Sequence, residues 1–487
     1  MEQINTEALK KKILDLAIRG KLVEQDPNDE PASVLLEKIR VEKEELIQQK
    51  KIKRNKNESY IFKGDDGLYY EKFQDGTVKS IQDEIPFEVP EGWEWVRLIN
   101  FAKEIKAGGD KPLDISYTKD NNYKYPVFSN GVKNDGLYGY TTKPIVNEPA
   151  ITISARGTIG YSVIREPNFF PIIRLIFITF HEIYSDIYFL NFIFKVLIPK
   201  KEGTSIPQLT VPNMKDKLIP IPPLKEQIRI KERVENALNE ISKIEEIQYE
   251  NIKLLKNIKN KTLSLAMQGK LVPQDPKDEP ASVLLEKIKE EKEKLILEGK
   301  IKRNKKESTI LRRGESYYEL LDGKEKDITN EIPFEIPEKW MWIRLRDIAK
   351  EIKAGGDRPT EVSKIKNEIY QYPIYSNGSK NKGLYGYSKR AIIKESAITI
   401  SARGTIGYSE IRQPNFTPIV RLICILLNTK FIDIKYINYV FNLLISPQEG
   451  TSIPQLTVPN IREKLIPLPP NKEQMKISII LDKLKEV

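Results

Sequence analysis

A long, nearly identical repeat is the feature that most constrains how this chain can fold. The segment ITISARGTIGYS occupies residues 151–162 and occurs again at 398–409, 247 positions later in a chain of 487 residues. EIKAGGDKP at 104–112 likewise returns as EIKAGGDRP at 351–359. Repeats of this length are far longer than the 20–50 residues of solenoid units. The sequence therefore predicts two copies of one domain.

The repeat is also circular. Residues 472–487 align with 225–240, and Met1 aligns with Glu250. The middle of the chain thus carries one continuous segment whose second copy is divided between the two chain ends. If the copies are related by a two-fold axis, we expect the two ends of the chain to lie near one another.

The central segment has the pattern of a long helix. Apolar residues recur along one stripe of 225–268 among Lys and Glu, and such a helix would span about 66 Å. Gly269 is expected to end it, with Pro273 preventing continuation. We expect the divided copy to pack against it as an antiparallel coiled coil. Further helices are expected at 31–49 and 280–299.

Short apolar or alternating runs between these helices predict strands. The clearest are residues 93–98, 150–154 and 174–180, each with a counterpart in the second copy, and 185–197 is expected to form a buried helix. The predicted fold class is mixed α/β, with two similar α/β domains separated by a pair of long antiparallel helices. The expected domains are 1–56 (helical), 57–224 (α/β), 225–306 (long helix and hairpin), 307–471 (α/β) and 472–487 (helix).

Composition narrows the functional class. The formal net charge of +11 favours a polyanionic partner. Five cations at residues 50–56 and five at 300–306 account for nearly all of it. We predict phosphate contacts there by Lys51, Lys53, Arg54, Lys302, Arg303 and Lys305, with solvated surface loops as the alternative. The single cysteine, the lack of a signal segment and the lack of a membrane-length apolar run lead us to expect a cytoplasmic protein.

The repeated Gly-rich turns supply candidate DNA contacts. The spacing of the glycines matches neither of two common phosphate-binding motifs, G-x-x-x-x-G-K-[ST] and G-x-G-x-x-G. Instead, each turn would lift an arginine out of a sheet, and arginine reads guanine well in the major groove. Pairing with a nearby carboxylate is the alternative for Arg156. The predicted contacts of this kind are Lys111, Lys133 and Arg156, and in the second copy Arg358, Lys380 and Arg403.

Two further pairs of residues allow a structural and a functional interpretation. Asn130 and Asn377, in SNG turns, could bond an adenine edge or stabilise their own turn. Arg174 and Arg421 lie within apolar runs, where a buried structural partner is the alternative to DNA.

Catalytic motifs are poorly represented. His181 is the single histidine, its counterpart is Asn428, and we expect it to lie on the surface. No Cys/His cluster suggests a metal site, and no motif of an amino-methyltransferase is found. We therefore predict no catalytic, cofactor-binding or metal-binding residue in this chain.

Three motifs together resemble one family. GKLVPQDPKDEPASVLLEKIKEEKEKLILEGKIKR (269–303), LIPIPPLKEQ (218–227) and the twofold SARGTIG are similar to the specificity subunit of Type I DNA restriction-modification systems. The resemblance covers essentially the whole chain, including the circular order of its parts.

The resemblance implies a division of labour. Each α/β domain would recognise one half of a bipartite site on double-stranded DNA, and the helices would fix the gap between the halves. The helices would also dock two methylation subunits, which bind S-adenosylmethionine and methylate adenine at N6. Restriction subunits driven by ATP with Mg²⁺ would complete the nuclease. This chain would supply recognition, not chemistry.

The likeness of the two copies predicts similar, inverted half-sites. Any divergence is expected at residues 113–124 against 360–371, and at 143–144 against 389–390. Two rival hypotheses remain open. A self-sufficient methyltransferase or nuclease would need a catalytic segment, and an adaptor that binds only protein would leave the paired basic clusters unexplained.

Overall fold

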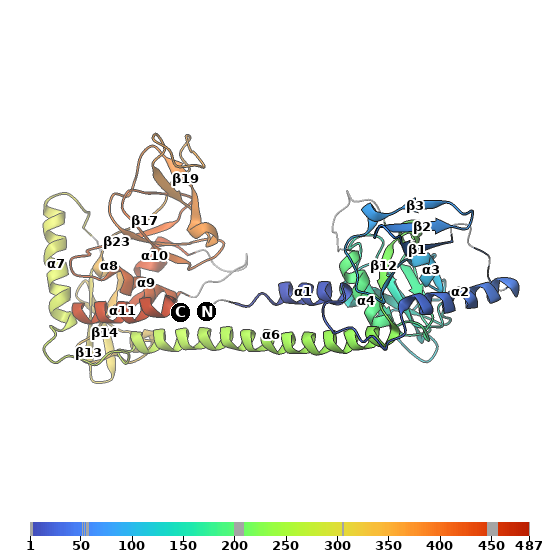
Figure 1. Cartoon of the computed structure of the whole chain (residues 1–487). Coiled ribbons are helices and arrows are strands. Elements are labelled where there is room, and N and C mark those ends of the chain that lie inside the picture. Colours follow the sequence, from blue (N-terminus) through green and yellow to red (C-terminus); the bar gives the residue numbers. More distant parts are fainter. Residues whose placement is uncertain are drawn as a thin grey trace. The chain divides into compact units, whose positions relative to one another are not determined.

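The computed structural model describes residues 3–50, 52, 54, 58–198, 209–303, 306–445 and 456–486. The chain forms two compact units, Glu2–Tyr249 and Glu250–Val487, here called the N-terminal and C-terminal units (Figure 1). The boundary between them falls inside the longest helix, α6 (Leu224–Met267). It lies at the position where the sequence repeat aligns Glu250 with the start of the chain.

Each unit is a mixed α/β fold built around a four-stranded antiparallel sheet. In the N-terminal unit the strand order is β5-β11-β8-β9, and a second sheet, β10-β6-β7, contains one parallel and one antiparallel pair. The helices are α1 (Thr6–Ile18), α2 (Ala32–Gln48), α3 (Leu98–Phe101), α4 (Ile187–Leu197) and α5 (Val211–Lys215), with 3-10 turns η1 (Gln82–Glu84) and η2 (Lys133–Gly136). The strands are β1 (Ser59–Lys63), β2 (Tyr69–Phe73), β3 (Val78–Ser80), β4 (Glu94–Arg97), β5 (Glu104–Ala107), β6 (Tyr125–Phe128), β7 (Leu137–Thr141), β8 (Ala150–Ile153), β9 (Ser162–Arg165), β10 (Phe170–Pro171), β11 (Ile176–Thr179) and β12 (Leu218–Ile221).

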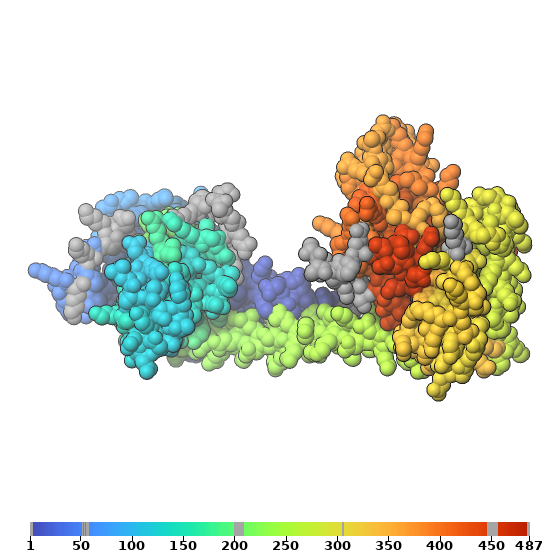
Figure 2. Space-filling view, turned by 180° about the vertical axis from the view of Figure 1, so that it is seen from behind, coloured from blue at the N-terminus to red at the C-terminus, as the bar shows by residue number. Residues whose placement is uncertain are grey.

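The C-terminal unit repeats this arrangement with the sheets β17-β23-β20-β21 and β19-β18-β22. Both views show α7 along one side of this unit (Figures 1 and 2). Its helices are α7 (Ala281–Leu297), α8 (Leu345–Ile348), α9 (Ile434–Leu444), α10 (Val458–Arg462) and α11 (Asn471–Glu486), with 3-10 turns η3 (Thr329–Glu331) and η4 (Lys380–Gly383). The strands are β13 (Ser308–Arg313), β14 (Ser316–Leu321), β15 (Lys324–Asp327), β16 (Met341–Arg344), β17 (Ala349–Ala354), β18 (Tyr372–Tyr375), β19 (Leu384–Ser388), β20 (Ala397–Ile400), β21 (Ser409–Arg412), β22 (Thr417–Pro418), β23 (Ile423–Leu427) and β24 (Leu465–Leu468).

These elements confirm the predicted fold class of two similar, mixed α/β units with a long helix. The predicted helices at 225–268, 31–49 and 280–299 appear as α6, α2 and α7, within two residues at each end. The finer five-part division of the chain stays a prediction. No helix in the described part of the chain is long and apolar enough to cross a membrane.

Helices from both ends of each repeat pack into one core. In the N-terminal unit, Ala17 and Ile18 of α1 share a buried cluster with Ile230 and Val234 of α6. Lys10 Nζ lies 2.8 Å from Glu245 Oε1. Since the earlier residue of α1 contacts the later part of α6, the two helices are antiparallel. In the C-terminal unit, Ile477 and Leu481 of α11 join Ala266 and Met267 in the equivalent cluster. The circular repeat of the sequence is therefore a feature of the packing inside each unit.

Two short motifs that occur in both copies, QDP and KEQ, make the contact that joins the two ends of each copy. Gln25 Nε2 donates to Gly20 O at 3.0 Å and to Glu226 Oε1 at 2.9 Å. Gln274 makes the same two contacts, with Gly269 O at 3.2 Å and Glu473 Oε1 at 2.5 Å. Both glutamates are almost fully buried. Burial raises the pKa of each of these carboxyl groups, although the glutamine amides and, for Glu473, the Trp340 indole donate to them.

The next residue of the same motif fixes the adjacent loop. Gln227 accepts from Asp186 N at 2.9 Å and donates to Pro222 O at 3.1 Å. Gln474 does the same with Asp433 N and Pro469 O, at 2.9 and 3.0 Å. Since both glutamines are fully buried, these backbone bonds hold the start of the helix against the entry to α4 or α9.

Gly269 ends α6, as predicted, and also permits close packing. Its φ is +68°, and Lys270 N bonds to Leu265 O at 2.9 Å, which is the pattern of a Schellman cap. A Cβ at this position would lie 2.3 Å from Pro337 Cγ and 3.2 Å from Trp340 Cζ2. The glycine is thus needed for its backbone conformation and for the absence of a side chain.

We expect Gly269→Ala to lower the free energy of unfolding of the C-terminal unit by about 3 kcal/mol, from left-handed strain of ~1–2 kcal/mol and overpacking of ~1–3 kcal/mol. Gly314→Ala is the matched control, because Gly314 has a φ of +64° and nothing within 4 Å of the added Cβ. Urea unfolding of both variants measures the difference. Equal losses would contradict the packing role of Gly269.

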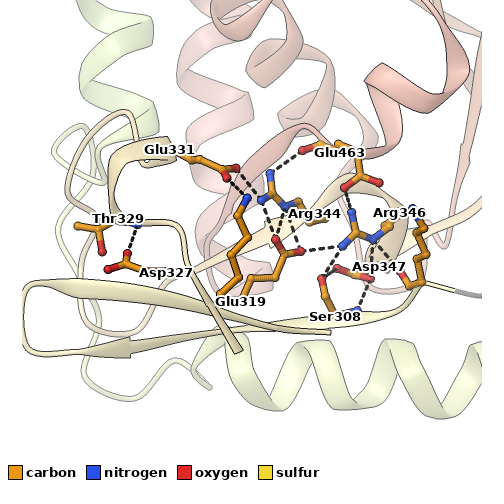
Figure 3. A network of polar contacts seen from close by, with 11 residues as sticks. Ser308, Glu319, Asp327, Thr329, Glu331, Arg344, Arg346, Asp347 and Glu463 are labelled. Atoms are coloured by element: carbon orange, nitrogen blue, oxygen red, sulfur yellow. Dashed lines mark hydrogen bonds and ion pairs between the residues drawn. The ribbon is translucent and has the colours of Figure 1, made fainter. Parts of the chain in front are cut away.

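A buried ionic network joins the hairpin β13–β14 to the strand and helix that follow (Figure 3). Arg344 Nη2 lies 2.7 Å from both Glu319 and Glu331. Arg346 Nη2 lies 2.7 Å from Glu319, and its guanidinium also pairs with Glu463. Burial alone would raise the pKa of Glu319, but hydrogen bonds from Arg344 and Ser308 and the two arginine charges lower it to about 2.

The N-terminal unit carries a smaller version of this network. Arg97 bonds to Glu71 and Glu84, each at 2.8 Å, as Arg344 does to its glutamates. Ile99 and Asn100 stand where the other unit has Arg346 and Asp347. Both units thus share the arginine–glutamate network, and Arg346 extends it in the C-terminal unit.

Arg346→Ile is expected to destabilise the C-terminal unit by up to about 3–5 kcal/mol, because it removes one of the two arginine charges at buried Glu319 and the arginine beside buried Asp347. The variant should also unfold at higher pH. Ionised Glu319 stabilises the fold above its ordinary pKa near 4.5, and this contribution is lost as the pH falls towards 2. Acid unfolding followed by hydrogen exchange in β13–β16 measures both effects.

The double variant Arg346→Ile/Asp347→Asn copies the pair found in the N-terminal unit and should recover part of the lost stability. A double variant no more stable than the single one would mean that the unpaired aspartate is not the cause of the loss.

Candidate nucleic-acid interface

Four turns meet at one edge of the sheets in the N-terminal unit. They follow β5, β6 and β8 and precede β11. Gly108 N bonds to Leu175 O at 2.8 Å, and Arg174 N bonds to Gly108 O at 3.0 Å. The Asn130 amide, on the turn after β6, bonds to two other turns. Its Nδ2 donates to Ile173 O on the turn before β11, and its Oδ1 accepts from Ala155 N on the turn after β8, each at 2.7 Å. The predicted contacts Lys111, Asn130, Lys133, Arg156 and Arg174 all lie on these turns.

The C-terminal unit builds the same surface with the same bonds. Asn377 Nδ2 donates to Val420 O at 2.6 Å, and Asn377 Oδ1 accepts from Ala402 N at 2.7 Å. Arg421 N bonds to Gly355 O at 3.0 Å. The predicted contacts Arg358, Asn377, Lys380, Arg403 and Arg421 lie on these turns. In each unit, therefore, sequence reasoning selected residues that the fold brings together.

The asparagines have a structural role in both units. Each amide uses its oxygen on one turn and its nitrogen on another, and each side chain is only partly exposed. The turn-stabilising interpretation of Asn130 and Asn377 therefore has direct support. A contact from either residue to a base stays a prediction.

Arg174 and Arg421 are exposed, and not buried as their apolar neighbours in the sequence suggested. Each follows a β-branched residue, and all four have left-handed backbone: φ is +52° and +57° at Ile173 and Arg174, and +52° and +58° at Val420 and Arg421. Such residues rarely adopt this conformation, so the surrounding bonds must enforce it. Strain at an exposed arginine is typical of a functional site.

The turn after β5 presents a cation beside aromatic rings. Lys111 Nζ lies 5.3 Å from the centre of the Tyr138 ring and 5.9 Å from that of Tyr117. In the C-terminal unit Arg358 Cζ lies 5.4 Å from the Tyr385 ring centre, with Lys364 Nζ at 4.0 Å. Hydrogen bonds with Tyr117 and Lys111 lower the pKa of Tyr138. Tyr117 and the cations are exposed and Tyr138 and Tyr385 partly exposed, so the cluster can contact both sugar-phosphate and base surfaces.

The remaining cations of the surface are exposed. Lys133 and Lys380 open the 3-10 turns η2 and η4. Arg156 and Arg403 follow the buried alanines that bond to the asparagine amides.

Sequence reasoning missed one pair of buried residues that supports this surface. Arg165 and Arg412, at the ends of β9 and β21, are buried and have no carboxylate within ion-pair distance among the described residues. Arg165 Cζ lies 3.7 Å from the Phe128 ring centre, Nε bonds to Thr152 Oγ1 at 2.9 Å, and Nη2 bonds to Asp135 O. Burial lowers the pKa of Arg165 to about 10. The only signal in the sequence was the repetition of SxIR after the SARGTIG turn.

The two basic clusters are only partly described. Lys51, Lys53 and Lys305 lie outside the described residues. Arg54 pairs with Glu44 of α2. Nη1 and Nη2 of Arg303 donate to Glu293 of α7, at 2.6 and 2.7 Å. Lys302 is exposed. The pairing reduces the charge available to phosphate at Arg54 and Arg303, so their DNA contact stays a prediction with a competing partner.

His181 corrects one expectation. It is 9 % exposed and not a surface residue, and its Nδ1 lies 3.4 Å from Glu42 Oε1. Burial lowers its pKa, so the ring is neutral near pH 7. Within the described ranges, no group of three or more His, Cys, Asp or Glu side chains could hold a metal ion.

The duplicated surface, the circular core and the long helix define a protein of two similar units that carry the same surface. A family model described as "Type I restriction modification DNA specificity domain" matches residues 90–254 and 337–486, which together are more than half of the chain. The chain therefore belongs to this family, as its motifs suggested.

Several known proteins are similar to this chain. The chain is 27% identical to the Type I restriction enzyme EcoAI specificity subunit of Escherichia coli over 567 aligned positions, which cover 98% of this chain and 88% of the relative. It is 39% identical over 147 residues to a putative type I specificity subunit of Mycoplasma pneumoniae, covering 30% of this chain and 44% of that protein. The crystal structure of the HsdS subunit from Thermoanaerobacter tengcongensis matches 82% of this chain and 91% of its own, with 16% identity and a TM-score of 0.47.

Asn130→Asp tests the structural role of the amide. The aspartate keeps an acceptor for Ala155 N but loses the donor to Ile173 O and places a charge against that carbonyl. We expect the free energy of unfolding of the N-terminal unit to fall by about 1–3 kcal/mol. Hydrogen exchange should quicken at residues 154–160 and 172–175. A variant that lost DNA binding with unchanged stability and exchange would instead make Asn130 a base contact.

Proposed function

We propose that this chain is the DNA-recognition subunit of a Type I restriction-modification complex, and that each unit contacts one half of a bipartite site on double-stranded DNA. The observation that carries the proposal is the recurrence of the four-turn surface, with the same backbone bonds and matched exposed cations, in both units. Family membership supports it.

The recognising residues follow from the surface. Arg156 and Arg403 are the proposed base contacts, since an arginine on a turn can present a bidentate donor pair to guanine. Lys111, Lys133, Arg174 and their counterparts Arg358, Lys380 and Arg421 would bond to phosphate or base edges beside them. The four-turn surfaces repeat so closely that we propose similar, inverted half-sites separated by a fixed gap.

The other functions are assigned to partners. We propose that the long helices set the gap and dock two methylation subunits, which would bind S-adenosylmethionine and methylate adenine at N6. Restriction subunits using ATP with Mg²⁺ would join the same complex, and its place would be the cytoplasm. The chain itself would be non-catalytic. A methylation assay on the isolated chain, with labelled S-adenosylmethionine and plasmid DNA, should show no transfer, and transfer would favour a self-sufficient enzyme.

Sequencing of N6-methyladenine in a methylation-free host tests the recognition proposal. Cells that express the full chain with its methylation subunits should carry one bipartite, gapped motif with similar inverted halves. Two unrelated half-sites would contradict the symmetry, and absence of sequence-specific methylation would contradict the proposed function. An adaptor that binds only protein would also fail to retain DNA in filter binding at any salt concentration.

Substitution of one arginine should separate base contact from phosphate contact. Arg156→Ala is expected to cost about 1–3 kcal/mol on the cognate duplex and to relax the motif at one position. Lys302→Ala should weaken binding to all duplexes and reduce the salt slope by up to ~0.9. Titrations of cognate and random duplexes across salt concentrations measure both. Equal effects of Arg156→Ala on both duplexes would make this residue a backbone contact.

A further inference from the structure

The turn that begins with Lys133 or Lys380 has the same backbone in both units. Asn134 and Asp135 have φ, ψ of 48°, 40° and 51°, 29°. Asn381 and Lys382 have 48°, 37° and 51°, 30°. Two successive non-glycine residues in the left-handed region form an uncommon turn. The fold therefore places the second of these residues in the same way twice.

The same contacts hold the turn in each unit. Arg165 Nη2 donates to the carbonyl oxygen of Asp135, and Arg412 Nη2 donates to that of Lys382 at 2.7 Å. Behind the turn, Ser129 N bonds to Gly136 O at 2.8 Å, and the equivalent bond in the C-terminal unit is 2.9 Å. All these bonds reach main-chain atoms, so they do not depend on which side chain the turn carries.

The side chain at the tip nevertheless changes sign between the units. Asp135 presents a carboxylate in the N-terminal unit, and Lys382 presents an ammonium in the C-terminal unit, where its side chain is 73% exposed. Both lie two residues beyond a predicted DNA-contacting lysine, on the four-turn surface.

A tyrosine beside the turn has a carboxylate acceptor in each unit, but a different residue supplies it. The Tyr161 hydroxyl donates to the Asp135 carboxylate. Tyr408, its counterpart, donates instead to Glu410 Oε2 at 2.7 Å, and Glu410 takes the place of Val163. Burial and the carboxylate bond raise the pKa of both tyrosines to about 12. Each phenol thus has an acceptor whichever charge the tip carries. Glu410 Oε1 also lies 3.4 Å from Lys382 Nζ, so it is a competing partner for this exposed ammonium.

We propose that Asp135 and Lys382 are specificity-determining residues that make the two half-sites differ at one base-pair position. The proposal rests on the DNA recognition proposed above. It predicts that the two half-sites are similar but not identical. A carboxylate accepts from an exocyclic amino group of cytosine or adenine and repels phosphate, whereas an ammonium donates to guanine O6 and N7. The N-terminal unit therefore selects a donor on the DNA at this position, and the C-terminal unit selects an acceptor.

Two reciprocal exchanges test this assignment. Asp135→Lys/Val163→Glu gives the N-terminal unit the pair found in the C-terminal unit, and Lys382→Asp/Glu410→Val does the reverse. Each double variant keeps an acceptor for its tyrosine. Val163→Glu and Glu410→Gln alone are the controls, because each keeps the residue at the tip and an acceptor for the tyrosine. Thermal melting of the full chain verifies that each variant is folded.

The readout is the set of duplexes enriched from a randomised library by the full chain assembled with its methylation subunits. Wild type should enrich a gapped motif whose halves match except at one position, with guanine presented to the C-terminal unit there. Each double exchange should make the motif symmetric and disfavour the original base about tenfold or more, while the single controls retain the wild-type motif.

Two results would overturn the inference while leaving the proposed function intact. The first is a gapped wild-type motif that neither double exchange alters. The second is an exchange of Lys382 that weakens cognate and random duplexes by the same factor, since that would make the ammonium a phosphate contact. If wild type enriches no motif at all, the proposed function fails and the inference falls with it.

Discussion

A hydrogen bond from a surface glutamine to a buried glutamate joins distant parts of the chain in each unit. Gln25 reaches Glu226, and Gln274 reaches Glu473, across roughly two hundred positions in each case. Because one partner follows the helix that enters the repeat and the other begins the helix that leaves it, the bond joins the two ends of each copy. A glutamate carboxylate left without a donor at either of these buried positions would cost more than the net contribution of one hydrogen bond. This contact is the structural counterpart of the circular order of the sequence, because it joins segments that the repeat places at opposite ends of one copy.

A second layer of bonds turns this scaffold into a recognition surface. Asn130 and Asn377 connect turns that come from different strands, and the buried Arg165 and Arg412 hold the neighbouring turn from beneath. Exposed cations then project from backbone that is already fixed. Such preorganisation lowers the entropy that DNA binding would have to overcome.

Sequence reasoning predicted the fold class and the long helix, because a repeat and a helical period are visible in the sequence alone. It named the charged residues of the turns but not that these turns lie together. It could not place Arg174, since an apolar neighbourhood along the chain does not reveal a left-handed turn that exposes the side chain. It also missed Arg165 and misjudged His181. Their burial depends on tertiary neighbours, such as Phe128 and Glu42, that no local pattern identifies.

The bonds that hold the four turns end almost entirely on carbonyl oxygens and amide nitrogens. Every residue type except proline offers both groups, so the supports of the surface are indifferent to the side chains they carry. Substitutions at the tips of the turns can therefore accumulate without unfolding the domain beneath them. A protein built in this way is free to drift to new targets in small steps while its architecture stays the same.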